Sequence, residues 1–359
     1  MNKYKICVYA ICKNEEKNTY KWFDSMREAD YVCVLDTGST DNSVNILKNL
    51  GVIVESKVID PFRFDIARNE SLKLIPKDTD ICVCTDLDEV FIPGWRSELE
   101  KVWNKNTNRV QYTYNWKLED NKPVISFLYD KIHSNGDYIW THPVHETLKY
   151  LKDNEKYNIC ENIILNHYPD ISKSRDNYLK LLELSVAEDP LDDRNMHYLG
   201  REYMYYKMYN EAIDTLIKHL LLKSATWKDE RSASKRFIGR CYMNLNRINE
   251  ARIWYNMAIL EAPYLRDPYV ELAFLEYEDK NYNKVIELLN SADNIKLHNK
   301  TYINEPFSWD HTIYDLLSIS YYNIKDYKNS LLNINKALEL SPNNERLLKN
   351  KKIIEQTNN

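Results

Sequence analysis

Hydrophobic residues follow two different patterns along the chain, and the change falls near residue 170. In the N-terminal part, short apolar runs alternate with amphipathic segments of helical length; the runs are KICVYAIC, YVCVLD, VIVESKV and DICVCTDLD. Apolar runs without polar alternation are typical of strands buried on both faces of a sheet. Strands separated by helical segments predict βαβ units, and hence an α/β domain with a Rossmann-like mixed sheet that is mostly parallel.

The C-terminal pattern is helical throughout, and it repeats. The segments YLGREYMYYKMYNEAIDTL and FIGRCYMNLNRINEARIWYNMAILEAP align with Gly200 over Gly239, and two weaker copies place Ala273 and Ser318 at the same position. Small residues that recur where two helices cross are typical of stacked helical hairpins. These copies resemble tetratricopeptide repeats over about residues 195–350. The irregular piece NIKLHNKTYINEPFSWDHT is predicted to be an insertion between the third and fourth copies.

The length of 359 residues is enough for two or three domains. We predict a catalytic α/β domain over 1–168, a linker over 169–194 and an all-α repeat domain over 195–359. The net charge is only -5, so a nucleic-acid partner is not expected.

Cysteine usage and hydropathy bear on the compartment. The seven cysteines include no CxxC pair and lie mostly in apolar runs, where a thiol behaves as a small hydrophobic group. No apolar stretch is long enough to span a bilayer, and the run ICVYAIC is followed at once by KNEEKN instead of a cleavage site. We therefore expect a cytoplasmic protein without a membrane span.

Three carboxylates stand at the ends of predicted strands. Asp36 closes one apolar run, and Asp86 and Asp88 close another. In an open parallel sheet, ligands bind beyond the carboxyl ends of the strands, so these side chains are expected to face one crevice. Asp86 and Asp88 are two residues apart and are aimed to one side in extended backbone. Two such oxygen donors suit a divalent Mg or Mn ion that also binds phosphate oxygens.

Four segments in order carry a resemblance to a known family. YAICKNEE, VLDTGSTDNS, ARNESL and TDLDEVFIPGW resemble the family 2 glycosyltransferases of GT-A fold, over about residues 3–167. The resemblance implies a metal-dependent enzyme that uses a nucleotide-diphosphate sugar, expected to be a uridine nucleotide. It also implies that Asn14, Glu15 and Asp36 hold the nucleoside, and that Arg68 lies near the base or the diphosphate.

The metal shell is also implied by the resemblance. Asp86 and Asp88 form the DxD motif, with Asp88 as the direct metal ligand and Asp86 on the donor side. His167 in ILNHYPD stands where such enzymes often carry a histidine that completes the shell, and a neutral imidazole is an acceptable ligand for Mn. The alternative for His167 is a histidine hydrogen-bonded at a domain junction.

An inverting transfer needs a carboxylate that takes the proton of the acceptor. Such enzymes commonly carry an acid pair at this stage of the chain, and here the place is taken by His145 and Glu146. We predict Glu146 as the base and His145 as its neighbour, with His145 in reach of the leaving diphosphate. Asp137 and Glu89 are the alternative bases.

The fusion of the two parts resembles a subgroup in which some members glycosylate peptides or proteins. The repeat domain is expected to hold a peptide, protein or glycan acceptor, or to form a homodimer. Lys173 and Arg175 fall in what is often a loop over the donor, or in a solvated linker. Trp95 and Trp140 either stack on a sugar or belong to the core.

Two rival functions remain open at this stage. The first is a non-catalytic scaffold in which the repeats bind a partner and the glycosyltransferase domain is degenerate; the presence of every expected carboxylate speaks against it. The second is a sugar nucleotidyltransferase, which usually carries a glycine-rich phosphate loop after the first strand, whereas AICKNEEKN contains no glycine. The sequence does not name the sugar or the acceptor.

Overall fold

The computed structural model describes residues 3–170 and 178–358. The chain divides into two compact units. One comprises Met1–Ser185 with Lys300–Tyr302, and the other comprises Val186–Asn299 with Ile303–Asn359. The three-domain boundaries that the sequence suggests stay a prediction.

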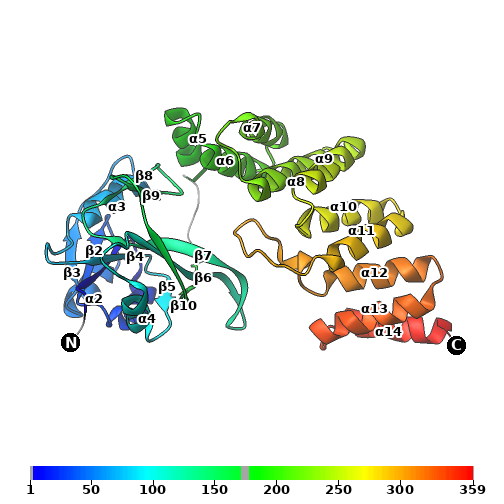
Figure 1. Cartoon of the computed structure of the whole chain (residues 1–359), viewed down its shortest axis with the longest axis horizontal. Coiled ribbons are helices and arrows are strands. Elements are labelled where there is room, and N and C mark those ends of the chain that lie inside the picture. The colour runs from blue at the N-terminus through cyan, green and yellow to red at the C-terminus, as the bar shows by residue number, and fades with distance from the viewer. Residues whose placement is uncertain (1–2, 171–177, 359) are drawn as a thin grey trace. The chain divides into compact units, whose positions relative to one another are not determined.

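The first unit is built on one eight-stranded sheet (Figure 1), with the strand order β3-β2-β1-β4-β7-β6-β10-β5. Its strands are β1 (Ile6–Cys12), β2 (Tyr31–Asp36), β3 (Ile53–Ser56), β4 (Ile81–Thr85), β5 (Glu89–Phe91), β6 (Arg109–Glu119), β7 (Lys122–Ser134) and β10 (Tyr157–His167). The first four strands in this order pair in parallel, β7 and β5 run antiparallel to their neighbours, and β10 pairs in parallel with β6. The predicted mixed, mostly parallel sheet is confirmed.

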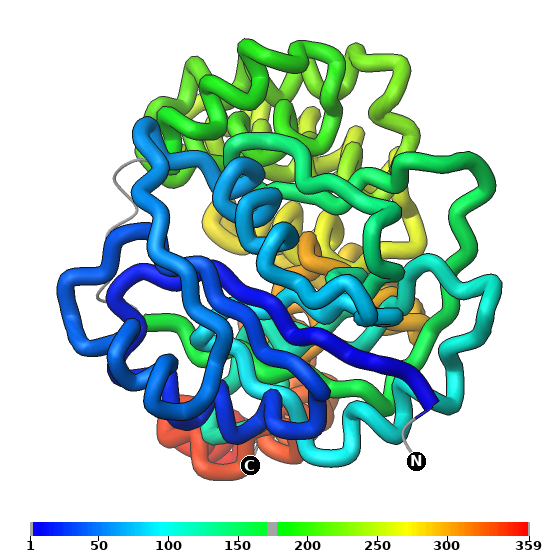
Figure 2. Tube along the Cα trace, turned by 90° about the vertical axis from the view of Figure 1, so that its left-hand side faces the viewer, coloured from blue at the N-terminus to red at the C-terminus, as the bar shows by residue number. Residues whose placement is uncertain are grey.

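Two apolar layers cover the sheet because successive side chains of a strand point to opposite faces. Ile6, Val8 and Ala10 of β1 belong to a core shared with α1 (Glu16–Met26), α2 (Ser43–Asn49) and α4 (Trp95–Val102). Cys7 and Tyr9 belong to the core of the other face, with α3 (Phe64–Leu72) and the hairpin of β8 (Tyr138–Thr141) and β9 (Thr147–Tyr150). Figure 2 follows the N-terminal strand through the sheet beside β2.

The cysteines of the first unit explain why the apolar runs of the sequence lack alternation. All seven cysteines of the chain are free and buried. Cys7, Cys33, Cys82 and Cys84 pack within the core of the second face, where each acts as a small apolar side chain. Both faces of the strands are therefore apolar, as expected for a sheet that is covered on two sides.

The second unit is all-helical, and from α6 onward each helix packs against the next along the chain (Figure 1). After α5 (Tyr178–Glu188), the helices are α6 (Asp193–Tyr205), α7 (Tyr209–Leu221), α8 (Lys228–Asn244), α9 (Ile248–Glu261), α10 (Asp267–Glu278), α11 (Tyr282–Asn294), α12 (Thr312–Asn323), α13 (Tyr327–Leu340) and α14 (Glu345–Asn358). Four helical hairpins follow one another, as the four sequence copies predict. The predicted insertion lies between α11 and α12 and contains a short 3-10 helix, η1 (Pro306–Ser308).

The small residues of the repeats lie where paired helices touch. A Cβ atom on Gly200 would stand 2.5 Å from Cγ of Leu216, and one on Gly239 would stand 2.7 Å from the ring of Tyr255. In the fourth copy, the hydroxyl of Ser318 instead donates a 2.9 Å hydrogen bond to the carbonyl of Ser330. Close helix packing therefore accounts for these positions, as the sequence suggests.

No helix among the described residues combines the length and the apolar character that crossing a bilayer requires.

Candidate functional site

Asp36 ends β2 and shapes the turn that follows it. Its Oδ1 accepts a 3.0 Å hydrogen bond from the amide of Ser39, and Oδ2 lies 3.4 Å from the amide of Gly38. Gly38 has a φ of 106°, a conformation that favours glycine. Asp36 is only 3% exposed. The carboxylate that the sequence assigns to nucleoside binding therefore also holds the loop in place.

The loops after β1 and β2 are joined by hydrogen bonds between side chains and backbone. Asn14 has a φ of 56°, and its Oδ1 accepts a 2.7 Å bond from the amide of Thr40. Its own amide donates to Oγ of Ser39 over 2.9 Å. The amide of Glu15 donates to Oγ of Ser43 over 2.8 Å. The structure therefore brings Asn14, Glu15 and the turn of Asp36 together.

Arg68 lies on α3 and is 1% exposed. Its Nη2 donates to Oδ1 of Asp86 over 2.5 Å, its Nε donates to Oε1 of Glu146 over 3.0 Å, and its Nη1 lies 3.3 Å from the carbonyl of Thr85. Burial alone would lower the pKa of Arg68, but the charges of Asp86 and Glu146 contribute to raising it well above its usual value. Arg68 therefore stays charged and links the DxD motif to the predicted base.

Asp86 has a second cationic partner that the sequence analysis missed. Lys131 of β7 donates to Oδ2 of Asp86 over 3.2 Å and is 6% exposed. Burial favours the neutral form of Asp86, but the charges of Arg68 and Lys131 outweigh it and hold the pKa of this carboxyl well below its usual range. The available signal was a lysine within an otherwise largely apolar or aromatic strand segment, which is unusual unless it is paired.

Asp88 and His167 lie side by side, as the predicted metal pair requires. Oδ2 of Asp88 is 3.4 Å from Nε2 of His167, and Nδ1 of His167 is 3.0 Å from the carbonyl oxygen of Trp116. A carbonyl only accepts, so Nδ1 carries a proton and donates it. Burial lowers the pKa of His167, but the hydrogen bond with Asp88 and the charge of that carboxylate outweigh it and raise the pKa above its usual value. Nε2 therefore donates to Asp88 while the ring is charged, and it presents a lone pair on that side once its proton has been lost. This donor set of one carboxylate and one oriented imidazole fits a Mn-class ion.

His145 and Glu146 lie in the loop between β8 and β9. His145 has a φ of 52°, and its Nε2 lies 2.8 Å from the hydroxyl of Tyr178. The side chain of Glu146 is 11% exposed. The loop is fixed to the start of α3, because the amide of Phe64 donates to the carbonyl of Pro143. Glu146 thus adjoins Asp86 through Arg68, while His145 turns toward Tyr178.

The two alternative bases are placed differently. Glu89 is 1% exposed and accepts bonds of 2.8 Å from the amide of Asp86 and from the hydroxyl of Tyr114. Burial raises the pKa of Glu89. Asp137 accepts a bond from Ser134 and pairs with Lys152. Glu89 therefore supports the backbone of the DxD motif, and Asp137 takes part in a surface ion pair.

Four further candidates remain in the first unit, and the structure describes two of them. Trp95 and Trp140 are 1% and 3% exposed, so both belong to the core, the alternative that the sequence left open. Lys173 and Arg175 lie outside the described residues.

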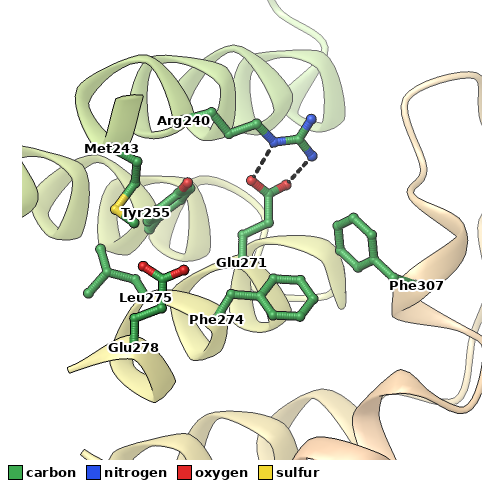
Figure 3. Close-up of a pocket in the computed structure, with 8 residues that line it drawn as sticks. All are labelled: Arg240, Met243, Tyr255, Glu271, Phe274, Leu275, Glu278 and Phe307. Atoms are coloured by element: carbon green, nitrogen blue, oxygen red, sulfur yellow. Dashed lines mark hydrogen bonds and ion pairs between the residues drawn. The ribbon is translucent and has the colours of Figure 1, made fainter. Parts of the chain in front are cut away.

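The helical unit has a pocket of about 200 Å³ (Figure 3). It is lined by Arg240, Met243, Tyr255, Glu271, Phe274, Leu275, Glu278 and Phe307. Arg240 donates two hydrogen bonds of 2.8 Å to Glu271 at one edge. The rings of Phe274 and Phe307 meet edge to face, with centroids 5.3 Å apart. The insertion therefore contributes an aromatic wall to this pocket.

The mixed, mostly parallel sheet, with Asp86 and Asp88 just beyond the carboxyl end of β4, is that of a GT-A-like domain. Residues 7–166 match the model of glycosyl transferase family 2, so the first unit contains a family 2 glycosyltransferase domain, and the resemblance noted in the sequence is confirmed for this part of the chain. No curated protein is a significant match.

Several solved structures are similar to part of the chain. MamA is 19% identical, with 46% of this chain and 88% of that chain covered and a TM-score of 0.38. PilF of Pseudomonas aeruginosa is 13% identical, with 50% and 72% covered and a TM-score of 0.38. YrrB, described as a TPR protein with an unusual peptide-binding site, is 14% identical, with 49% and 83% covered and a TM-score of 0.37. The tetratricopeptide-like character of the helical unit is visible in its own four consecutive hairpins.

Proposed function

We propose that the chain transfers a sugar from a nucleotide-diphosphate sugar, with uridine as the base, to a peptide, protein or glycan acceptor, and that the anomeric carbon is inverted. The observation that carries the proposal is the pairing of Asp88 with His167 at 3.4 Å, at the edge of the sheet that also holds the network of Arg68, Asp86 and Glu146. The family 2 match supports a glycosyltransferase in general.

A divalent ion, Mn or Mg, is part of this proposal. Asp88 and His167 would hold it, because the hydrogen bond from His167 Nδ1 to Trp116 leaves Nε2 as the ligand atom. When bound, the ion would supply positive charge to the leaving diphosphate. Both oxygens of Asp86 already accept bonds from Arg68 and Lys131, so Asp86 acts on the donor side through this network.

Donor binding is assigned to the joined loops after β1 and β2. Asn14, Glu15 and Asp36 would contact the nucleoside, since the hydrogen bonds between these loops hold their backbone in one arrangement. A loop that is ordered before binding loses less conformational entropy when the ligand arrives. His145 would contact the diphosphate from the loop that also carries Glu146.

Glu146 would take the acceptor proton as the acceptor attacks the face of the sugar opposite the diphosphate. A base must be ionised to do so. The 3.0 Å bond from Arg68 fixes the direction of the Glu146 carboxylate. Arg68 would thus position the base and the DxD motif together.

The acceptor is proposed to bind the helical unit. Its pocket of about 200 Å³ combines the aromatic rings of Tyr255, Phe274 and Phe307 with the charged pair of Arg240 and Glu271, and it would hold one side chain or one sugar of the acceptor. A homodimer through the repeats is the alternative use of this surface. A cytoplasmic location also belongs to the proposal, because all seven cysteines are buried and free.

The test is calorimetric binding of uridine diphosphate to the full chain, with and without Mn, for the wild type, Asp88→Ala and Asp78→Ala. Asp78 is the matched control, because it is an exposed carboxylate that precedes the opposite, amino end of β4. We expect Mn-dependent binding in the wild type and in Asp78→Ala, and a loss of at least tenfold in affinity in Asp88→Ala.

Guanosine and thymidine diphosphates belong in the same series. If one of these binds in a metal-dependent way and uridine diphosphate does not, the transferase function stands and only the nucleobase of the proposed donor changes. Absence of binding for all three would overturn the proposal and favour the scaffold function.

A further inference from the structure

A second group of metal-ligating side chains lies in the helical unit, apart from the residues proposed for the transferase. Asp193 begins α6, His219 lies in the last turn of α7, and Glu230 lies in the first turn of α8. One ligand atom from each of the three side chains lies within 4.8 Å of those of the other two. Three helices that are consecutive along the chain (Figure 1) therefore meet at one cluster.

His219 is fully buried, and its ring is oriented by a polar chain. Its Nδ1 lies 2.9 Å from Oγ of Ser234, and the same Oγ lies 2.7 Å from Nδ1 of His197. The Ser234 hydroxyl is thus shared by the two imidazole rings, and it fixes the ring of His219 with Nδ1 toward Ser234 and Nε2 on the other side of the ring, toward Glu230.

The other nitrogen of His219 points into the cluster without a hydrogen bond. Oε1 of Glu230 lies 3.3 Å from Nε2 of His219, yet Nε2 has no hydrogen-bond partner. The distance would allow a hydrogen bond, so the carboxylate must stand off the direction in which Nε2 would donate. An off-axis oxygen is unfavourable for a hydrogen bond but normal for two ligands of one ion.

The distance itself matches the geometry of a tetrahedral ion. Bonds of about 2.0–2.1 Å to nitrogen and oxygen place neighbouring ligands of a tetrahedral zinc ion about 3.3 Å apart, which is the separation of His219 Nε2 from Glu230 Oε1. Two carboxylates neutralise a divalent charge in a buried place, where an unpaired charge would be costly. An imidazole ligand favours zinc or cobalt over magnesium.

We propose that Asp193, His219 and Glu230 bind a divalent ion of the zinc class, at a site separate from the donor site, and that the ion holds α6, α7 and α8 together. Ser234 orients the imidazole from behind, as outer-shell hydrogen bonds commonly do in zinc sites. Because the three ligands come from three helices, the site forms only when these helices are packed, and binding therefore stabilises the folded helical unit.

The test measures zinc and cobalt binding to the full chain carrying Asp88→Asn, which removes the proposed donor-site ion. We expect one tightly held zinc equivalent by equilibrium dialysis and elemental analysis, a rise of several degrees in Tm on adding zinc, and the strong visible absorption of tetrahedral cobalt when cobalt is added. In the Asp88→Asn background, His219→Gln and Glu230→Gln should lose the bound zinc and the rise in Tm. His311→Gln, which changes a histidine elsewhere in the same unit, should keep both.

The cobalt spectrum needs no variant in the cluster, so it decides the question even if His219→Gln fails to fold. Absence of zinc uptake and of the tetrahedral cobalt spectrum in Asp88→Asn protein would overturn the proposal and leave His219 as the partner of an ordinary ion pair with Glu230. Unchanged zinc uptake in both cluster variants would do the same. Failure of uridine diphosphate to bind the wild-type protein would count against the transferase proposal and would leave the zinc proposal unaffected.

Discussion

Arg68 Nε donates a 3.0 Å hydrogen bond to Oε1 of Glu146, 78 positions further along the chain. The same guanidinium is bonded to Asp86, so one buried side chain joins the residue proposed to take the acceptor proton to the motif proposed to bind the donor. We derive one prediction for Glu146 and one for Arg68 from this arrangement. Two further predictions concern the packing of Gly239 and the titration of His133.

Replacing Glu146 with Gln is expected to lower kcat by about 10²–10⁴-fold, because an amide cannot take the proton. Binding of the nucleotide should stay close to the wild-type value, since the side chain keeps its size and its acceptor oxygen toward Arg68. The measurement is the rate at which nucleoside diphosphate is released from a nucleotide sugar, with the nucleobase that the calorimetric binding experiments identify. Asp137→Asn is the control and should retain kcat within a few-fold; the opposite pattern would transfer the role of base to Asp137.

Arg68→Met is expected to destabilise the first unit by about 3–5 kcal/mol, because it leaves Glu146 without its buried cation and Asp86 with Lys131 alone. Arg68→Lys should recover only part of this stability, because an ammonium cannot reproduce three guanidinium bonds in fixed directions. Urea unfolding of both variants measures the effect. Stability equal to the wild type in Arg68→Met would show that the network contributes little to folding.

The repeat glycine Gly239 gives a prediction for the helical unit. A Cβ atom there would lie 2.7 Å from Cε1 of Tyr255, so Gly239→Ala is expected to cost about 1–3 kcal/mol through overpacking. Combining it with Tyr255→Leu removes the clashing ring, and the double variant should lose less stability than the two single changes added together. Strict additivity in thermal unfolding would refute the proposed contact.

His133 gives a prediction for pH. It is 1% exposed, its Nδ1 lies 2.9 Å from the Ser134 carbonyl and its Nε2 lies 2.8 Å from the Tyr9 hydroxyl. Tyr9 receives a bond from Trp140, so its own proton is available to Nε2, and both nitrogens are satisfied in the neutral ring. Burial lowers the pKa of His133 to about 4.

The unfolded chain takes up this proton near pH 6.5, while the folded protein does not until about pH 4. Stability is therefore complete above pH 6.5 and falls as the pH drops toward 4, by up to about 3 kcal/mol from this one group. The measurement is the free energy of unfolding in urea between pH 7 and 4.5. His133→Gln should give a shallower dependence on pH, and an unchanged slope would contradict the assignment.

Much of the fold followed from local patterns. Uninterrupted apolar runs identify the strands that are buried on both faces, and the period of 3.6 residues identifies the helices. The repeats predicted the close approach at Gly200 and Gly239. The placement of Asp88 and His167 together also agrees with the sequence, because both follow from their positions at strand ends.

Other features depend on pairs that are distant in the chain, and these only the tertiary structure decided. Lys131 is an unusual residue in its strand segment, but its partner is known only once β7 lies beside β4 and brings the lysine to Asp86. The cluster of Asp193, His219 and Glu230 has no spacing that marks a metal site, because its ligands come from three helices. The sequence by itself determined the four parallel strands β1 to β4, the helical repeats and the carboxylates that follow β2 and β4. The remaining strands, β5 to β10, were not predicted from the sequence. Which charges meet was decided by packing, because burial leaves an ion no partner other than the one that the fold brings to it.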